Sequence, residues 1–260
     1  MSATDPPVPS RPTGILPGAE PFSAAGGPVG VLVLHGFTGN PSSVRGLAEA
    51  CAAAGHAVEC PLLPGHGTTV EDLATTSWDD WAAAAEAALA GLAGRCDRVV
   101  VAGLSMGGAL TCWLATRHPE LAGIICVNPA VAPSEDMTAL VAAMVEAGES
   151  YMDGIGNDVA DPDVVESAYD RLALAPLLSM FVVSGRVRAR LGSVTCPLLL
   201  MTSPQDHVVP PTDSDVLAGA VSGPVERVSL DRSFHVATID FDRDLIIQRS
   251  LGFIAEVGVA

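Results

Sequence analysis

The stretch that decides the fold reads Val99-Val100-Val101-Ala102-Gly103-Leu104-Ser105-Met106-Gly107-Gly108. An apolar, β-branched run of strand length leads into the pattern Gly-x-Ser-x-Gly, and helical spacing follows from Ala109 to Arg117. This order of strand, sharp turn and helix is the context of a nucleophile elbow, in which a serine sits on a strained turn. Glycines are expected on both sides of Ser105 because strand and helix crowd each other there. Ser105 is therefore the candidate nucleophile, with the positive end of a helix dipole beneath it.

Apolar runs of strand length alternate with helical patterns along almost the whole chain. Val29–Leu34 is a continuous apolar run, which is typical of a strand buried on both faces of a parallel sheet. Further strands are predicted at 57–60, 99–104, 124–127, 197–201 and 225–230, and helices at 42–54, 77–92, 109–117 and 245–255. This alternation predicts an α/β fold whose mostly parallel central sheet is flanked by helices.

The length of 260 residues predicts a single domain over residues 1–260, large enough to bury a core. The first 13 or so residues are rich in Pro, Ser and Thr and are expected to form a loose leader. No strand is predicted between about 132 and 190, where short helical patterns carry several methionines. We expect this cap segment (residues 132–190) to lie over the strand ends as a lid and to line an acyl pocket. The alternative is a set of extra helices packed on one flank.

The charge balance and the cysteines indicate which binding partners and which cell compartment to expect. The formal charge is −17 and the chain contains no lysine, which argues against binding nucleic acid or anionic lipid and favours an uncharged substrate. The six cysteines have no C-x-x-C spacing, which favours buried reduced thiols in a cytoplasmic protein. The N-terminus has no signal-peptide pattern, and no apolar stretch reaches the ~20 residues that stable membrane insertion requires.

A serine nucleophile needs a base and an acid that orients the base, and both can be assigned. His235 is the best base because it follows the last predicted strand in a loop position. Asp206 is the best acid because it follows the strand at 197–201 through a short polar turn. The other histidines are weaker candidates: His35, His56, His66, His118 and His207. The competing acids are Asp213, Asp215 and Asp231, the first two of which fit the first turn of a helix. The chain order Ser105, Asp206, His235 is that of α/β-hydrolases.

An oxyanion hole also has candidates. His35-Gly36-Phe37 ends the first clear strand, where a loop of this fold supplies one backbone N–H, and the residue after the nucleophile supplies the second. We therefore predict that the N–H groups of Phe37 and Met106 hold the oxyanion. This chemistry needs no metal and no organic cofactor.

Several motifs together resemble those of small bacterial carboxylesterases and monoacylglycerol lipases. They are Gly18-Ala-Glu-Pro-Phe22, Leu34-His-Gly-Phe-Thr-Gly39, Gly65-His-Gly67, Gly103-Leu-Ser-Met-Gly-Gly108, Asp206-His-Val-Val-Pro-Pro211 and His235-Val-Ala-Thr-Ile-Asp240. The stretch from Tyr151 to Tyr169 is similar to the cap of the monoacylglycerol lipases in particular. The resemblance implies the same triad and oxyanion hole and a small cap. It also implies that Ile155 meets the acyl chain and that Glu166 meets the glycerol.

These observations predict a serine esterase that acts on monoacylglycerols or similar small neutral esters. One alternative is a general carboxylesterase on short-chain esters. Another keeps the triad but changes the reaction, as in a thioesterase, a C–C bond hydrolase or a perhydrolase, since fold does not fix function. A binding protein on a hydrolase scaffold predicts a missing triad member, and none is missing here. The sequence gives no prediction of the oligomeric state.

Overall fold

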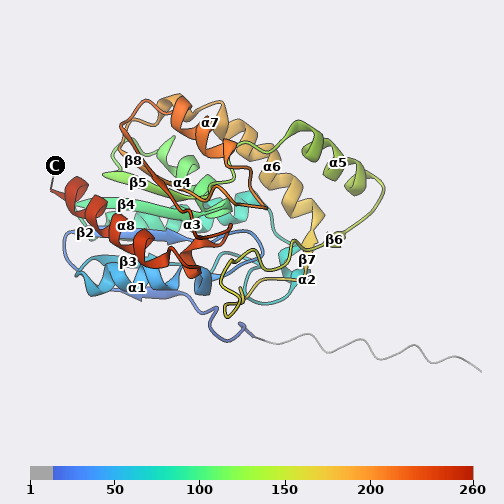
Figure 1. Cartoon of the computed structure of the whole chain (residues 1–260), viewed down its shortest axis with the longest axis horizontal. Helices are drawn as coiled ribbons and strands as arrows, with labels where there is room; N and C mark the ends of the chain where they lie inside the picture. Colours follow the sequence, from blue (N-terminus) through green and yellow to red (C-terminus); the bar gives the residue numbers. More distant parts are fainter. Residues whose placement is uncertain (1–13, 260) are drawn as a thin grey trace, which may run out of the picture.

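The computed structural model describes residues 14–259, and the leader expected at residues 1–13 lies outside this range. A seven-stranded sheet runs through the molecule in the order β1-β3-β2-β4-β5-β8-β9 (Figure 1). All neighbouring strands pair in parallel except β1 and β3, which are antiparallel. The strands of this sheet are β1 (Phe22–Ala24), β2 (Val29–Leu34), β3 (Ala57–Cys60), β4 (Arg98–Leu104), β5 (Gly123–Val127), β8 (Leu198–Thr202) and β9 (Val225–Ser229). The mostly parallel α/β sheet predicted from the apolar runs is confirmed.

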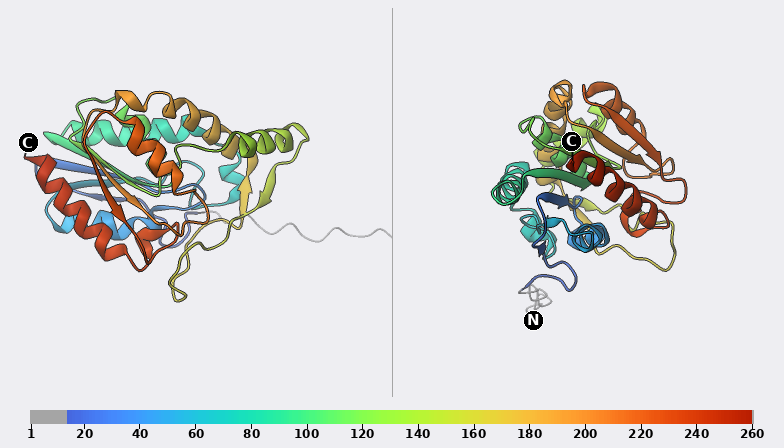
Figure 2. Two further views of the ribbon diagram at one scale, coloured as in Figure 1. Left: turned by 45° about the horizontal axis from the view of Figure 1, so that its top comes forward. Right: turned by 90° about the vertical axis from the view of Figure 1, so that its left-hand side faces the viewer.

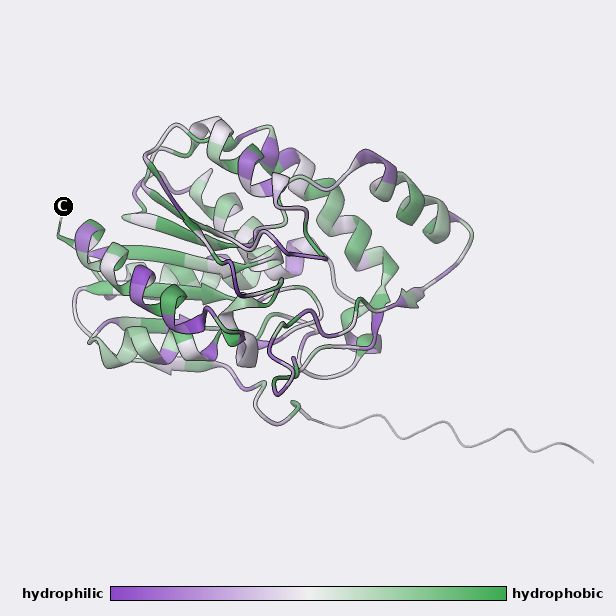
Figure 3. Cartoon of the chain, viewed as in Figure 1, coloured by the Kyte–Doolittle hydropathy of each residue, from purple (hydrophilic) through white to green (hydrophobic). Residues whose placement is uncertain are grey.

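Helices cover both faces of the sheet (Figure 2). On one face α1 and α8 pack against side chains such as Val31, Val33 and Ile125. On the other face α3 and α4 pack against Leu32 and Ile124. The helices are α1 (Arg45–Ala53), α2 (Val70–Leu73), α3 (Trp78–Ala93), α4 (Met106–Ala115), α5 (Glu135–Glu146), α6 (Leu174–Arg188), α7 (Thr212–Ala220) and α8 (Arg243–Gly258). Because successive strand residues face opposite sides, the central strands are apolar throughout, as Figure 3 shows.

Two short elements of the main body, β1 and α2, were not predicted from the sequence. The edge strand β1 has three residues, and it is ordered by antiparallel pairing with β3 across 36 positions of sequence. The single turn α2 begins after Thr69, whose side chain accepts the N–H of Asp72 at 3.1 Å. The helix predicted over 42–54 divides into a 3₁₀ turn at Pro41–Ser43 and α1. Elements this short depend on capping and distant partners rather than on hydrophobic periodicity.

The cap segment contains more than helices, which corrects the prediction that it holds no strand. Its elements are α5, an antiparallel pair of short strands and the long helix α6; the strands are β6 (Tyr151–Asp153) and β7 (Arg171–Ala173). Figures 1 and 2 show α5, β6 and β7 beyond one end of the main sheet. This is the end at which β4 leads into Ser105, so the segment lies over the carboxyl ends of the strands. Within residues 14–259, the helices are too short or too polar to cross a bilayer.

Candidate active site

Ser105 lies on a sharp turn between β4 and α4. Its backbone has φ 56° and ψ −117°, a strained conformation for a residue with a side chain. A Cβ on Gly103 would lie 2.1 Å from the carbonyl oxygen of Gly107, and a Cβ on Gly107 would lie 2.2 Å from that of Leu34. Both glycines are therefore required by steric contact with backbone, which is the reason given for them from the sequence. The turn exposes Ser105 to a cavity of about 350 Å³.

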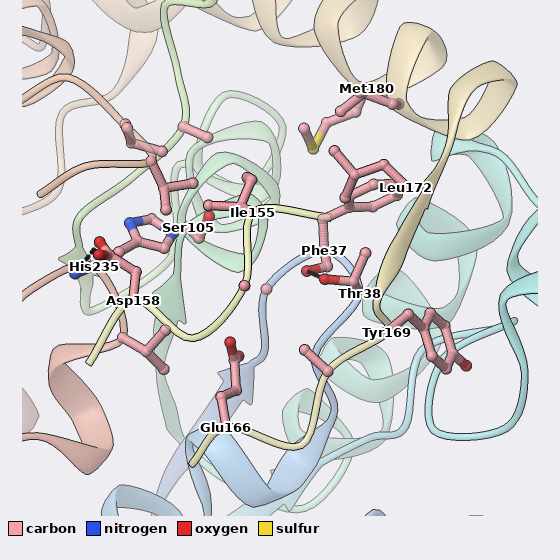
Figure 4. A pocket seen from close by; sticks show the side chains of 18 of the residues that line it. Phe37, Thr38, Ser105, Ile155, Asp158, Glu166, Tyr169, Leu172, Met180 and His235 are labelled. Carbon is pink, nitrogen blue, oxygen red and sulfur yellow. Dashed lines mark hydrogen bonds between the residues drawn. The ribbon is translucent and has the colours of Figure 1, made fainter. Parts of the chain in front are cut away.

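The structure brings Asp206 and His235 into direct contact beside Ser105. Asp206 Oδ2 accepts a hydrogen bond from His235 Nδ1 at 2.7 Å, and the two side chains are only 2% and 8% exposed. Asp206 Oδ1 accepts the N–H groups of Val208 and Val209, both at 2.8 Å. Because the carboxylate accepts at Nδ1, that nitrogen carries the proton and Nε2 is left as the basic nitrogen of the neutral ring. His235 and Ser105 line the same cavity (Figure 4).

A buried polar network fixes the two loops that carry this pair. Asn128, at the end of β5, has a φ of 45° and donates from Nδ2 to the carbonyl oxygen of His235 at 2.8 Å. Its Oδ1 accepts the N–H of Ser203 at 2.8 Å, and Ser203 Oγ donates to the carbonyl oxygen of Phe234 at 2.8 Å. Both side chains are buried, so the network ties the two loops to each other and to the end of β5. Asn128 directly follows the strand predicted at 124–127, and its role in this network was not predicted.

The loop after β2 approaches Ser105 closely through Gly36. A Cβ on Gly36 would lie 3.3 Å from Ser105 Cβ. His35 is fully buried; its Nδ1 donates to the carbonyl oxygen of Gly36 at 2.9 Å and its Nε2 accepts the N–H of Leu63 at 3.1 Å. Burial lowers the pKa of His35 to about 4, so the ring is neutral and can make both bonds. Among the described residues, the N–H groups of Phe37 and Met106 donate to no protein acceptor.

Comparisons with known proteins agree with this geometry. Residues 31–240 match the sequence profile described as the Alpha/beta hydrolase family. The chain belongs to the α/β-hydrolase family. It is 47% identical over 245 residues to a thermostable monoacylglycerol lipase from Bacillus sp. (strain H-257), covering 93% of this chain and 96% of that protein. It is 25% identical to a carboxylesterase from Bacillus subtilis (strain 168), covering 92% and 97% of the two chains.

Solved structures lead to the same family. One solved structure, whose description names the two metagenome-derived lipolytic enzymes LipS and LipT, superposes on this chain with a TM-score of 0.90 at 40% identity. The superposition covers 94% of this chain and all of the other. The monoacylglycerol lipase of Paleococcus ferrophilus has a TM-score of 0.75 at 18% identity, with 92% and 99% of the chains covered, and this likeness concerns the fold alone. The resemblance stated from the sequence motifs is confirmed.

The α/β-hydrolase cavity is walled mainly by apolar side chains of the cap segment. They are Met137, Met152, Leu172, Leu177, Met180 and Phe181. Ile155 also lines the cavity and is 57% exposed, so it lies at the entrance. Glu166 is the half-buried carboxylate of this wall, and Figure 4 shows it reaching toward the site from below. Burial raises the pKa of Glu166, against an opposing effect of nearby His235.

The rival acids and histidines have other partners. Asp213 accepts the N–H of Ala132 at 2.7 Å, and burial raises its pKa. Asp215 pairs with Arg227 at 2.7 Å on the surface. Four of the remaining rivals contact other residues: Asp231 bonds Ser229, His118 bonds Glu86 and Glu120, His66 packs against His35, and His207 bonds Asp158. One acidic residue of the cavity wall, Asp158, was not singled out from the sequence.

Proposed function

We propose that the protein is a serine hydrolase of carboxylic esters and that monoacylglycerols are its substrates. One observation carries this proposal: a strained serine at a nucleophile elbow shares a cavity with a buried, hydrogen-bonded Asp206–His235 pair. The 47% identity to a monoacylglycerol lipase over nearly the whole chain supports the choice of substrate. A general carboxylesterase activity is the alternative, supported by the more distant carboxylesterase relative.

In the proposed mechanism, Ser105 Oγ attacks the ester carbonyl while His235 Nε2 takes its proton. Asp206 keeps the proton on Nδ1 and stabilises the imidazolium that forms. The N–H groups of Phe37 and Met106 hold the oxyanion of the tetrahedral intermediate. His235 then gives the proton to the leaving alcohol, and an acyl-enzyme remains on Ser105. Water attacks the acyl-enzyme with His235 again as base, which releases the acid and restores Ser105.

The form of the cavity supports a substrate with a single acyl chain. Its volume of about 350 Å³ lies near the lower end of the range for ligand pockets, and the cap side chains that wall it are apolar. We propose that the segment acts as a cap, that Ile155 meets the acyl chain at the entrance, and that Glu166 hydrogen bonds to the glycerol. The polar end of a monoacylglycerol would then lie between Glu166 and Ser105. A neutral glyceride also suits a protein with a formal charge of −17.

The cell compartment can be proposed from the thiols. All six cysteines, which lie within the described residues, are free, and five of them are buried. Burial raises the pKa of Cys51 to about 12 and that of Cys196 to about 11, which keeps these thiols protonated and unreactive. Free thiols are typical of a reducing compartment, so we propose that the protein works in the cytoplasm.

The test is a substrate panel on one preparation of the wild-type protein and of Ser105→Ala. We expect kcat/KM for 1-monolauroylglycerol to exceed that for dilauroylglycerol strongly, and Ser105→Ala to lose turnover and labelling by a fluorophosphonate. Preference for short p-nitrophenyl esters with glycerides ignored would favour the general carboxylesterase. Preference for acyl thioesters or C–C bond substrates would favour those reactions. Full turnover by Ser105→Ala would contradict the mechanism itself.

A further inference from the structure

One buried carboxylate of the cavity, Asp158, has no part in the mechanism above. It lies in the cap segment between β6 and β7, and its side chain is only 11% exposed. It lines the same cavity as Ser105 and His235, and Figure 4 shows it close to His235. A carboxylate is costly to bury unless hydrogen bonds or a counter-charge compensate, so its donors define what it does.

The donors to Asp158 come from the loops that carry the proposed acid and base. Asp158 Oδ2 accepts the backbone N–H of His235 at 3.0 Å and that of His207 at 3.2 Å. Its Oδ1 accepts Nδ1 of the His207 ring at 2.7 Å. The Asp158 carbonyl oxygen accepts the N–H of Val236 at 3.1 Å. His207 directly follows Asp206 in the chain. One cap side chain therefore holds both loops of the Asp206–His235 pair.

A second carboxylate, Asp240, lies on the His235 side and accepts hydrogen bonds from the cap. Asp240 is fully buried, and its Oδ2 accepts the N–H of Ala160 in the cap at 2.7 Å and the N–H of Phe234 at 2.9 Å. Its Oδ1 accepts the N–H of Asp161, also in the cap, at 3.0 Å. The cap stretch 158–161 and the loop around His235 are thus joined in both directions by charge-assisted hydrogen bonds, which are stronger than neutral ones.

We propose that Asp158 is a positioning residue, which aligns Asp206 and His235 on Ser105 only while this part of the cap is in place. The proposal rests on the proposed function, since it takes those two residues as acid and base. It makes the cap a part of the catalytic alignment as well as a wall of the pocket. Displacing 158–161 would remove the cap's hydrogen bonds to the N–H groups of His235 and Val236, while the Asn128 network would still hold the carbonyl side of this loop. A misplacement of His235 by about 1 Å can cost about a hundredfold in rate.

Two substitutions of Asp158 separate its hydrogen bonds from its charge. Asp158→Ala removes all the side-chain bonds to both loops. Asp158→Asn can keep them, because its amide oxygen can accept the two backbone N–H groups while its NH₂ donates to His207 Nδ1 in the other neutral tautomer. Asp163→Asn is the matched control, because Asp163 is exposed, lies on the same segment and takes no part in these bonds.

The readout is kcat and KM for a p-nitrophenyl ester, together with the melting temperature. We expect Asp158→Ala to lower kcat about ten- to hundredfold with KM within about threefold, Asp158→Asn to recover most of that loss, and Asp163→Asn to match wild type. Wild-type kcat in Asp158→Ala, or equal losses in the alanine and asparagine variants, would overturn the proposal. Full activity in Ser105→Ala would instead overturn the proposed function, so the two failures are distinguishable.

Hydrogen exchange on the wild-type protein covers the case in which Asp158→Ala does not fold. If the cap holds the His235 loop, the amides of Ala160 and Asp161 open together with those of His235 and Val236 and exchange with similar protection. Fast exchange at 160–161 with continued protection at 235–236 would show that the loop stays in place without the cap, and would overturn the proposal.

Discussion

Replacing Asp206 by asparagine should leave a folded protein with almost no turnover, and the structure explains both halves of that outcome. Asp206 Oδ1 accepts two backbone N–H groups, from Val208 and Val209, at 2.8 Å. An amide oxygen can replace Oδ1 there, but an amide NH₂ cannot, since two N–H donors would face it. The amide of Asp206→Asn is therefore held with its NH₂ toward His235 Nδ1, where Oδ2 accepts at 2.7 Å in the wild type.

The expected loss follows from the tautomer that this orientation imposes. A donor at the Oδ2 position makes His235 Nδ1 the acceptor, so the proton moves to Nε2 and the ring cannot take a proton from Ser105. The side chains of Asp206 and His235 are 2% and 8% exposed, which leaves water little access to repair the contact. An acid-to-amide change of this kind costs about 10⁴ in kcat, or about 5 kcal/mol of transition-state stabilisation.

The assay is steady-state turnover of a p-nitrophenyl ester together with a thermal melt, on wild type, Asp206→Asn and the control Asp215→Asn. Asp215 lies in an exposed pair with Arg227, so its amide variant should stay within about twofold of wild type. Asp206→Asn keeps the bonds to Val208 and Val209, and its melting temperature should fall by less than about 5 °C. A variant that retains more than about a tenth of wild-type kcat would refute the tautomer argument and the assignment of Asp206.

Three further outcomes are expected from contacts elsewhere in the structure. Gly107→Ala should yield no active enzyme, since its Cβ would lie 2.2 Å from the backbone of Leu34. A Cβ on Gly91, in helix α3, would meet open space, so Gly91→Ala should keep full activity and raise the free energy of unfolding by about 0.5–1 kcal/mol in chemical denaturation. Burial lowers the pKa of His35 from 6.5 to about 4, so protons bind preferentially to the unfolded chain. As pH drops from 6.5 to 4, this group should therefore lower the free energy of unfolding by about 3 kcal/mol. Urea titrations should show a smaller loss of stability over this pH range for His35→Asn than for the wild type. Glu166→Gln should lower kcat/KM for 1-monolauroylglycerol about tenfold and leave that for p-nitrophenyl butyrate unchanged, and equal effects on both substrates would argue against a glycerol contact.

The parts of the fold that could be predicted are those whose physical cause is local in sequence. Strand β4 is buried on both faces, so nearly every residue in it is apolar and no distant partner is needed to recognise it. Gly103 is required by contacts within the elbow itself, where a Cβ would meet the backbone of Gly107. Asp206 and His235 could be proposed because both follow strands of a parallel sheet, whose carboxyl ends meet at one edge.

The parts that could not be predicted depend on partners far along the chain. Strands β6 and β7 have three residues each and pair with each other, so neither leaves a period of two long enough to detect. The role of Asp158 depends even more on distant partners, because its hydrogen-bond donors His207 and His235 lie 49 and 77 residues away in the chain. Nothing in the sequence around it distinguishes it from the exposed Asp163.

Asp158 and Asp206 also show why residue type alone cannot assign a role at this site. Each carboxylate accepts two backbone N–H groups on one oxygen and a histidine Nδ1 on the other. For Asp206 that histidine is His235, whose side chain is 8% exposed, and for Asp158 it is His207, whose side chain is 60% exposed; both histidines line the cavity. The same acid-to-amide substitution should therefore abolish turnover at Asp206 and be tolerated at Asp158. The effect of the substitution on turnover depends on which histidine faces the new amide NH₂ and so changes its tautomer. That in turn depends on how the cap segment and the two loops are arranged in space.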